Sequence, residues 1–281
     1  MLIKITGNCN GNCPHCMDRC IPGNDQMMSE ETFDNILRLF KNVHFVLNIS
    51  GGEPTLHPNL LKLLSKITQP RFVTLISNGS FLLDPEKTKM VEKAIDLKYI
   101  NYVQITCIKE LYPNYEQLYP IITDYIGNGK YREKFIFSSD DKVIKMIDRG
   151  RASDNIAIYV DRIKKDKAAP SCLKTVLSAR QSDRYGTMAT ILNIQQGFCK
   201  PSVSWNGDII MSECSTCPSI GNVNKIDSLD EVYNRMKAFI PCGACLNYDL
   251  FMSSNDEKTK EVREFINKIT KQYENQEQPN R

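Results

Sequence analysis

Three cysteines lie close together near the start of the chain, within the run NCNGNCPHC. Thiolates are soft ligands that bind iron–sulfur clusters or zinc. A structural zinc site takes four protein ligands, whereas a chemically active centre keeps one position open. Cys9, Cys13 and Cys16 on a four-iron cluster would leave one iron without a protein ligand. The same three with His15 or Cys20 would instead close a zinc site, and a group of buried thiols without metal is the third interpretation.

A second group of cysteines occurs in the last third of the chain. Eleven cysteines are many for a protein in a reducing compartment, where clustered cysteines more often bind metals or catalyse reactions than form disulfides. The second group comprises Cys199, Cys214, Cys217, Cys242 and Cys245, and two isolated cysteines are Cys107 and Cys172. Two separated groups indicate two separate sites.

Two further segments carry glycine and polar residues directly after apolar runs. The first, SGGEP at residues 50–54, offers Gly51 and Gly52, which let a ligand approach the main chain closely. Glu53 adds a hydrogen-bond acceptor in the same loop. The second, SNGS at residues 77–80, follows the next apolar run. If the runs are neighbouring parallel strands, these two loops and the cysteine loop lie together at one edge of the sheet, which we call the mouth of the site.

Short β-rich runs alternate with helical patterns through the first half of the chain. Ser29 is the expected N-cap of the first helix, and Asp84 with Pro85 the cap and first position of the third. We expect helices over residues 29–41, 57–67 and from 85, and strands at 2–6, 44–50, 71–77, 102–107, 134–139 and 155–160.

Apolar strands that alternate with helices indicate parallel βαβ units buried on both faces. The predicted fold is therefore α/β, and a partial TIM-like (βα)6 barrel or a doubly wound sheet would fit. In either fold the loops that follow the strands gather at one edge, where such folds keep their chemistry.

The pattern changes after about residue 190. Residues 201–212 predict a β-hairpin with a two-residue turn at Asn206 and Gly207, and Ser228 with Glu231 fits the capping box of a following helix. This segment is too small and strand-poor for its own core, so we expect a metal to help stabilise it. We predict a barrel at residues 1–190, a small cysteine-rich subdomain at 191–250, and a charged C-terminal helix and tail at 251–281.

The composition argues against several kinds of partner. A net charge of +3 over 281 residues gives no case for nucleic acid or an anionic membrane as the main partner. No apolar run approaches the roughly 20 residues needed to span a bilayer, and no signal peptide precedes Leu2. We therefore expect a cytoplasmic protein.

The chain resembles the radical S-adenosylmethionine (radical SAM) enzymes over roughly residues 1–160. The resemblance rests on the C-x3-C-x2-C motif, GGEP at 51–54, SNG at 77–79 and the strand order. It implies that Cys9, Cys13 and Cys16 hold a [4Fe–4S] cluster whose open iron is chelated by the methionine amine and carboxylate of SAM. The SAM contacts that it implies are His15 near the adenine, Gly51, Gly52, Glu53 and Pro54 at the amine, Ser77 and Asn78 near the nucleoside, and Thr106 near the carboxylate.

In such an enzyme, one electron from the reduced cluster cleaves SAM to methionine and a 5′-deoxyadenosyl radical, which abstracts a substrate hydrogen. A flavodoxin or ferredoxin is the expected electron donor. Many relatives with a second cluster carry Ser-Leu-Asp-Gly after the fourth strand, whereas this chain has Thr-Cys-Ile-Lys at 106–109. Cys107, the one catalytic candidate, therefore either projects into the mouth as a hydrogen donor or packs as a small hydrophobic residue, as free cysteines usually do.

The second cysteine group resembles the auxiliary-cluster extension called SPASM, in its shorter "twitch" form. The resemblance implies an auxiliary [4Fe–4S] cluster bound by Cys199, Cys242 and Cys245, with Cys214 or Cys217 as the fourth ligand. Ser212 occupies the position where relatives usually place that ligand. A zinc knot is the alternative, because a C-x2-C pair near other cysteines is equally a zinc pattern.

The function implied is that of a radical SAM oxidoreductase. Relatives with the auxiliary extension often modify peptides, which makes a peptide one substrate class. A first strand that begins at Leu2 leaves no room for an N-terminal leader-binding domain, so a peptide would need another recognition route. The alternatives are a small-molecule dehydrogenase or isomerase, and a non-catalytic zinc or iron–sulfur protein that senses redox state or binds a partner.

Overall fold

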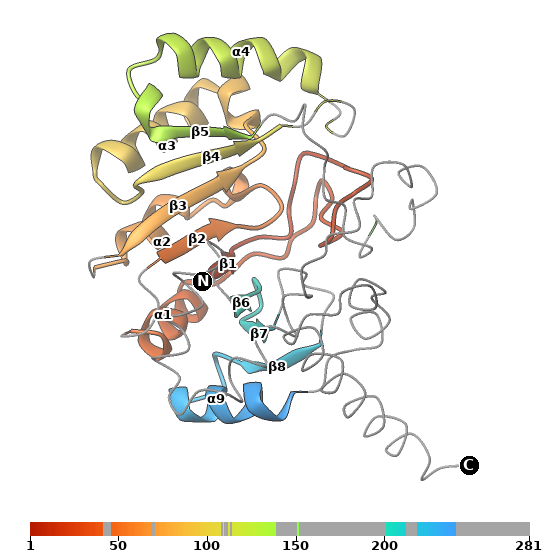
Figure 1. Ribbon diagram of the computed structural model, residues 1–281, viewed down its shortest axis with the longest axis vertical. Coiled ribbons are helices and arrows are strands. Elements are labelled where there is room, and N and C mark those ends of the chain that lie inside the picture. Colours follow the sequence, from red (N-terminus) through yellow and green to blue (C-terminus); the bar gives the residue numbers. More distant parts are fainter. Residues whose placement is uncertain are drawn as a thin grey trace, which may run out of the picture.

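A computed structural model describes residues 1–41, 46–68, 71–107, 109, 112, 114–138, 151, 201–211 and 218–239. Within these ranges the chain has an α/β fold built on one eight-stranded sheet, in the order β5-β4-β3-β2-β1-β6-β7-β8. The order can be followed in Figure 1 from β5 near the top to β8 near the bottom, with α4 above and α9 below. None of the helices in the described ranges is long and apolar enough to cross a membrane.

Five of the expected strands form the parallel part of the sheet. They are β1 (Leu2–Lys4), β2 (Val46–Ser50), β3 (Phe72–Ser77), β4 (Tyr102–Thr106) and β5 (Phe135–Ser138). Each pairs in parallel with its neighbour in chain order, so all their carboxyl ends lie at one edge. The sixth strand expected, at residues 155–160, lies outside the described residues, and the partial barrel stays a prediction.

Helices connect these strands; α1 and α3 begin where the sequence predicts, whereas α2 begins at Leu60, three residues after the expected start at residue 57. They are α1 (Glu30–Leu39), α2 (Leu60–Ser65), α3 (Pro85–Asp96) and α4 (Tyr115–Asn128), with short 3-10 helices η1 (Pro54–Leu56), η2 (Ser80–Leu83) and η3 (Arg132–Lys134). The Ser29 hydroxyl accepts a hydrogen bond from the amide of Thr32, and the Asp84 carboxylate caps α3 with Pro85 in its first turn. These caps satisfy amides that have no partner inside the helix.

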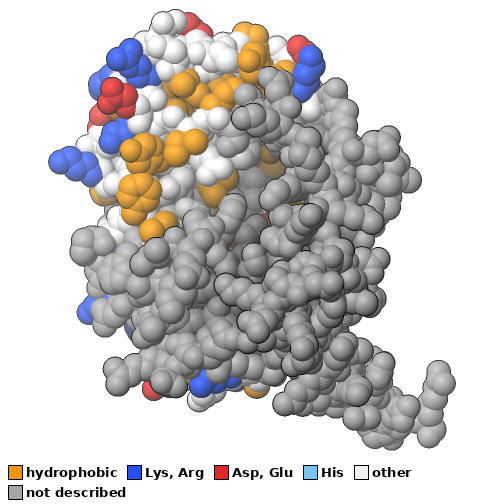
Figure 2. Space-filling view, in the orientation of Figure 1, with side chains coloured by type: hydrophobic (Ala, Val, Ile, Leu, Met, Phe, Trp, Pro, Cys, Tyr) orange, Lys and Arg blue, Asp and Glu red, His pale blue; other side chains and the backbone are white. Residues whose placement is uncertain are grey.

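The two faces of the parallel strands differ. Successive side chains alternate between faces, and one face carries the hydrophobic core, with Leu47, Ile49, Val73, Leu75, Val103 and Ile105 at most 2% exposed. On the opposite face Phe72 is 43% and Ile136 47% exposed, and the rings of Phe72 and Tyr102 lie 5.4 Å apart. Figure 2 shows hydrophobic side chains gathered where β3 to β5 lie in Figure 1. This face is therefore less completely covered than the core face.

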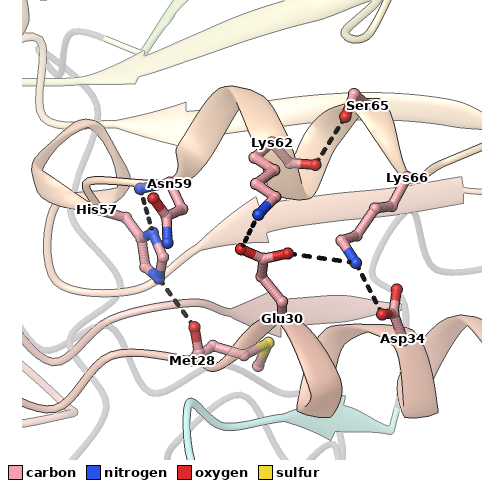
Figure 3. Close-up of polar contacts among 8 residues, drawn as sticks. All are labelled: Met28, Glu30, Asp34, His57, Asn59, Lys62, Ser65 and Lys66. Carbon is pink, nitrogen blue, oxygen red and sulfur yellow. Dashed lines mark hydrogen bonds and ion pairs between the residues drawn. The ribbon is translucent and has the colours of Figure 1, made fainter.

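A set of ion pairs joins α1 to α2. Lys62 lies 2.7 Å from Glu30, and Lys66 lies 2.7 Å from Asp34 and 3.5 Å from Glu30 (Figure 3). These side chains are partly or largely exposed, so solvent screens each pair and it adds little to stability. Their effect is to orient α2, which follows the GGEP loop, against α1.

The hairpin after residue 200 extends the same sheet. Its strands are β6 (Ser202–Val203), β7 (Asp208–Ile210) and β8 (Ser219–Asn222), followed by α9 (Leu229–Ala238). β6 pairs in parallel with β1, and β7 and β8 continue antiparallel. Val203, Ile209 and Met236 are fully buried in the core cluster that includes Ile3. The described part of this segment is thus held by packing and strand pairing on the main sheet.

The hairpin turn and the cap of α9 match their predictions in part. The hairpin is confirmed, but its connection spans residues 204–207, and only Gly207 has a positive φ, of 88°. Ser228 caps α9 as predicted, by accepting from the Glu231 amide, while the Glu231 carboxylate accepts from Arg235. The domain boundaries near residues 190 and 250 stay predictions.

Candidate active site

The cysteine loop brings two of its thiols close to Gly11. Cys9 and Cys13 are each 8% exposed, and the amide of Gly11 donates to the Cys9 sulfur at 3.4 Å. A Cβ atom on Gly11 would lie 3.2 Å from the Cys13 sulfur and 3.6 Å from the Cys9 sulfur. The amide of Cys16, which is half-buried, donates to the Cys13 carbonyl. None of these three cysteines is in a disulfide.

Burial and a neighbouring thiol set the charges in this loop. Burial raises the pKa of Cys9 to about 11 and that of Cys13 to about 12. The interaction of the two neighbouring thiols lowers the pKa of Cys16 and raises the pKa of Cys20. Thiols with raised pKa values stay protonated unless a positive charge such as a metal compensates for burial. Cys20 is 2% exposed, and its thiol donates to the Asp18 carbonyl at 3.9 Å.

The GGEP loop packs against the cysteine loop through its main chain. The amide of Gly52 donates to the Thr6 carbonyl at 2.7 Å, and that of Glu53 to the Asn8 carbonyl at 2.8 Å. A Cβ on Gly52 would lie 2.2 Å from the Asn8 oxygen, and one on Gly51 2.5 Å from the Thr6 oxygen. Gly51 also has a positive φ of 149°. The sequence pointed to ligand approach at these glycines, and the structure adds that the two loops meet there.

The Glu53 carboxylate is fully buried and receives donors from three residues. Its Oε1 accepts from the Thr55 amide at 3.1 Å and the Thr55 hydroxyl at 2.6 Å. Its Oε2 accepts from the Asn78 amide at 2.8 Å, and the Ser77 hydroxyl lies within 3.0 Å of both oxygens. Burial raises its pKa, and the hydrogen bonds act in the opposite direction. The carboxylate therefore joins the loop after β2 to the loop after β3.

Asn78 joins the third loop to the first. Its side-chain amide donates to the side-chain oxygen of Asn10 at 2.9 Å and approaches the Cys9 sulfur at 3.9 Å. Its own side-chain oxygen accepts from the Ser80 amide. The loops after β1, β2 and β3 are thus in direct contact, as the parallel topology predicts.

A tyrosine that the sequence did not single out lies beside His15. The Tyr112 ring is 5.7 Å from the imidazole, and its hydroxyl is 3.3 Å from that of Thr106, which donates to the Ser77 carbonyl. The Nδ1 atom of His15 is buried and has no hydrogen-bond partner among the described residues. Burial and the positive charge of Arg151 lower the pKa of His15 to about 4, so its ring is neutral at pH 7.

Two cationic residues that the sequence did not single out hold the second half of the cysteine loop. Lys4, 2% exposed, lies 2.6 Å from the Asp18 carboxylate. The Arg151 guanidinium donates to the carbonyls of Cys13 and Cys20. A lysine in an otherwise apolar strand was a usable signal for the first contact. No signal existed for the second, which spans more than 130 residues of sequence.

The remaining candidates divide into structural residues and undescribed ones. Cys107 is fully buried in the hydrophobic core, and burial raises its pKa to about 11, which fits packing better than projection into the mouth. Pro54 is buried in the first turn of η1, and His57 follows η1 with its ring bonded to the main chain. The second cysteine group lies outside the described residues: Cys199, Cys214, Cys217, Cys242 and Cys245.

No group of three histidine, cysteine or carboxylate side chains in the described ranges is arranged to hold a single metal ion. A four-iron cluster differs from a single ion because each thiolate binds its own iron. The thiols at Cys9, Cys13 and Cys16 form a donor set that could bind such a cluster, with the buried Nδ1 of His15 in the same loop.

Comparison with known families gives a match over more than half of the chain. The model of the radical SAM superfamily matches residues 3–153. That range contains the cysteine loop, the GGEP and SNG loops, strands β2 to β5 and all but the first residue of β1.

Curated relatives match shorter stretches. An S-adenosylmethionine-dependent nucleotide dehydratase of Thermoplasmatales archaeon (strain ISO4-H5) is 34% identical over 89 residues, which cover 31% of this chain and 32% of the relative. A probable GTP 3′,8-cyclase of Methanothermobacter marburgensis is 32% identical over 85 residues, covering 29% of this chain and 28% of the relative. The matches thus span about a third or less of these relatives' length. The solved structure of SuiB from Streptococcus suis bound to S-adenosylmethionine covers 87% of this chain and is itself covered to 70%, with 16% identity and a TM-score of 0.44.

Proposed function

The chain belongs to the radical SAM superfamily, and from that premise we propose that it cleaves SAM by one-electron reduction at a [4Fe–4S] cluster held by Cys9, Cys13 and Cys16. Membership implies both the cluster and SAM as cofactors. Bound together, they supply a 5′-deoxyadenosyl radical that removes a hydrogen atom from the substrate. The observation that carries the proposal is the contact between the cysteine loop and the two glycine-containing loops at the carboxyl edge of the sheet.

The three thiols fit a cluster in chemistry and in surroundings. Sulfur donors suit iron, and their burial limits access of water to the metal. The Gly11 amide and the Asn78 side chain both donate toward the Cys9 sulfur. Hydrogen bonds to cluster sulfurs help to set the reduction potential. Cys20 supports Cys16 and leaves three loop thiols as the proposed ligands.

We assign the SAM amine to main-chain oxygens of the GGEP loop. The Glu53 carboxylate accepts hydrogen bonds from Thr55, Ser77 and Asn78. We therefore assign it to fixing the shape of the loop and not to contacting a ligand. Gly51 and Gly52 are half-buried, so part of the main chain of this loop stays accessible. Buried Pro54 holds the loop's exit into η1.

We assign the nucleoside half of SAM to the neighbourhood of His15 and Tyr112. His15 and Tyr112 offer two adjacent rings, and the uncharged imidazole has a buried nitrogen available for a polar ligand atom. The Thr106 hydroxyl is oriented by Tyr112 and the end of β3. Ser77 is engaged by Glu53, so its part is to position Asn78. Together these groups orient the cofactor and exclude water.

For the substrate we propose a nucleotide as the first class to test. The two relatives above are named for reactions on nucleotides, whereas the peptide alternative rests on an auxiliary-cluster extension whose cysteines lie outside the described residues. Those relatives are a dehydratase and a cyclase, so a lyase or cyclase reaction stands beside the oxidoreductase prediction. The auxiliary cluster and a flavodoxin or ferredoxin as electron donor remain part of the proposal.

The test begins with anaerobic reconstitution. The wild-type chain should bind iron and sulfide and, with dithionite and SAM, form 5′-deoxyadenosine. Cys13→Ala should lose this product, whereas the matched control Cys107→Ala, in the core, should keep it. Product formation by Cys13→Ala would show that the ligand assignment is wrong. Nucleoside triphosphates and short peptides are then compared for acceleration of 5′-deoxyadenosine release, with mass spectrometry of the substrate.

A further inference from the structure

One residue far along the chain contacts three carbonyls of the cysteine loop. The Arg151 guanidinium donates through Nε to the Cys13 carbonyl at 2.9 Å and through Nη2 to the Cys20 carbonyl at 2.6 Å. The Arg151 amide donates to the Cys16 carbonyl at 2.9 Å. Two of these carbonyls belong to Cys13 and Cys16, which are proposed cluster ligands. The third belongs to Cys20, whose thiol interacts with that of Cys16.

The segment held in this way is one that local forces do not fix. Arg19 within it has φ of 54°, in the left-handed region that a non-glycine residue adopts only at a cost. The turn there is closed by a long hydrogen bond, 3.5 Å from the Arg19 amide to the Cys16 carbonyl. The Lys4–Asp18 pair anchors the segment to β1 on one side. The Arg151 contacts anchor it on the other.

We propose that Arg151 is a positioning residue for the metal centre. Its two-pronged guanidinium holds the 13–20 segment in the shape that presents the thiols, and its positive charge stabilises the electron-rich, reduced state of the cluster. The planar fork of an arginine can bridge two carbonyls at fixed separation, whereas a lysine supplies the same charge from one flexible donor. This inference deepens the proposed function and rests on it for the cluster, although the loop's shape is testable without metal.

The test uses Arg151→Lys, Arg151→Gln and, as a matched control, Arg132→Gln, which removes an exposed arginine from η3. The first readout is the rate at which iodoacetamide alkylates Cys13 and Cys16 in the folded, metal-free full chain, relative to the urea-unfolded chain. Both Arg151 variants should be alkylated roughly tenfold faster than wild type, because local opening exposes the thiols. Loss of a positive charge alone would slow alkylation, since it disfavours the thiolate.

The second readout is the midpoint potential of the reconstituted cluster. Arg151→Gln should shift it to more negative values by about 59 mV, which corresponds to a tenfold change in a one-electron equilibrium. Arg151→Lys should stay close to wild type, because the charge is kept. Both variants remove the bridge between two carbonyls, but only Arg151→Gln removes the charge. The difference between their potentials therefore reports the effect of the charge alone.

The positioning role and the charge role of Arg151 are each tested by a separate result. Unchanged alkylation in both Arg151 variants would overturn the positioning role, and an unchanged potential in Arg151→Gln would overturn the charge role. If Arg151→Gln unfolds, as seen by circular dichroism, Arg151→Lys decides both roles. Its alkylation rate tests the positioning role, and a midpoint potential far from wild type, although the charge is kept, would overturn the charge role. A wild-type chain that binds no iron would contradict the proposed function, while the alkylation ratio would still test the loop.

Discussion

The Ser77 hydroxyl lies 2.9 Å from one oxygen of the Glu53 carboxylate and 3.0 Å from the other. This contact joins the carboxyl ends of β2 and β3, deep below the surface, since Glu53 is fully buried and Ser77 is 2% exposed. Each carboxylate oxygen also receives a backbone amide, from Thr55 on one and Asn78 on the other. Glu53 is therefore an internal brace of the site.

The first prediction concerns this brace. In Glu53→Gln, whichever way the side-chain amide is oriented, its NH2 group must face one of the two backbone amides. The side-chain NH2 group and a backbone N–H group would then be two buried donors that face each other without an acceptor. We expect the free energy of unfolding of the metal-free protein to fall by roughly 2–4 kcal/mol, the sum of a lost charged hydrogen bond and an unsatisfied donor.

Urea unfolding followed by circular dichroism measures this difference. The exposed Glu116→Gln, on α4, is the control and should stay within about 0.5 kcal/mol of wild type. Equal stability of Glu53→Gln and wild type would mean that the buried carboxyl is protonated and does not brace the loops as an anion.

The second prediction concerns the contact between loops. Gly52→Ala would place its Cβ 2.2 Å from the Asn8 carbonyl oxygen, so the GGEP and cysteine loops must separate. We expect much lower iron incorporation and a loss of stability. Gly127→Ala in α4 has nothing within 4 Å of the new Cβ and should be neutral or stabilising by up to about 1 kcal/mol. Iron per chain after reconstitution is the measurement, and full loading of Gly52→Ala would contradict the loop contact.

The third prediction is a pH dependence. His57 accepts from the Asn59 amide at Nδ1, so its proton is on Nε2, which donates to the Met28 carbonyl (Figure 3). Burial lowers the pKa of His57 below its ordinary value of 6.5. Below pH 6.5 the unfolded chain therefore binds a proton that the folded chain does not. The free energy of unfolding should fall as the pH decreases through this region.

Urea midpoints of wild type and His57→Asn at pH 7.5 and 5.5 measure this contribution. The variant should be less stable at pH 7.5 but should lose less stability between the two values. A loss equal to that of wild type would show that His57 does not titrate differently on folding.

The fourth prediction compares two ion pairs. Lys4→Met leaves the Asp18 carboxylate, 12% exposed, without its buried cation, and we expect destabilisation of roughly 3–5 kcal/mol. Adding Asp18→Asn should recover part of this loss. In the matched exposed pair, Lys89→Met next to Glu86 should change stability by less than about 1 kcal/mol. Thermal or urea unfolding gives all of these values. Similar effects at the two sites would contradict the buried position of the Lys4–Asp18 pair.

Local signals in the sequence predicted much of the described fold. Caps at Ser29, Asp84 and Ser228 are local, because each acts on amides within three residues, and the structure has them where expected. Strand order along β1 to β5 followed from alternation with helices. The position of β6 beside β1 did not, because that pairing joins residues 200 positions apart and leaves no periodic trace.

In the candidate site, too, some features could be predicted from the sequence and others could not. The three loops were predicted to meet because parallel strands place their carboxyl ends together. Tyr112 and Arg151 were missed, since their contacts with His15 and the cysteine loop depend on how the chain returns to the site. Glu53 was expected as a hydrogen-bond acceptor in this loop, and the structure shows that its carboxylate accepts from Ser77. A single acidic residue in a glycine loop gives no information on which direction it points.

The central claim is that the metal at Cys9, Cys13 and Cys16 has one iron open for SAM. The most direct measurement is electron–nuclear double resonance on the reduced, reconstituted wild-type protein with SAM labelled with 15N at its amine. The account predicts a hyperfine coupling from that nitrogen to the cluster and a changed EPR spectrum on adding SAM. A spectrum unaltered by SAM, with no coupling and every metal position filled by protein side chains, would contradict it.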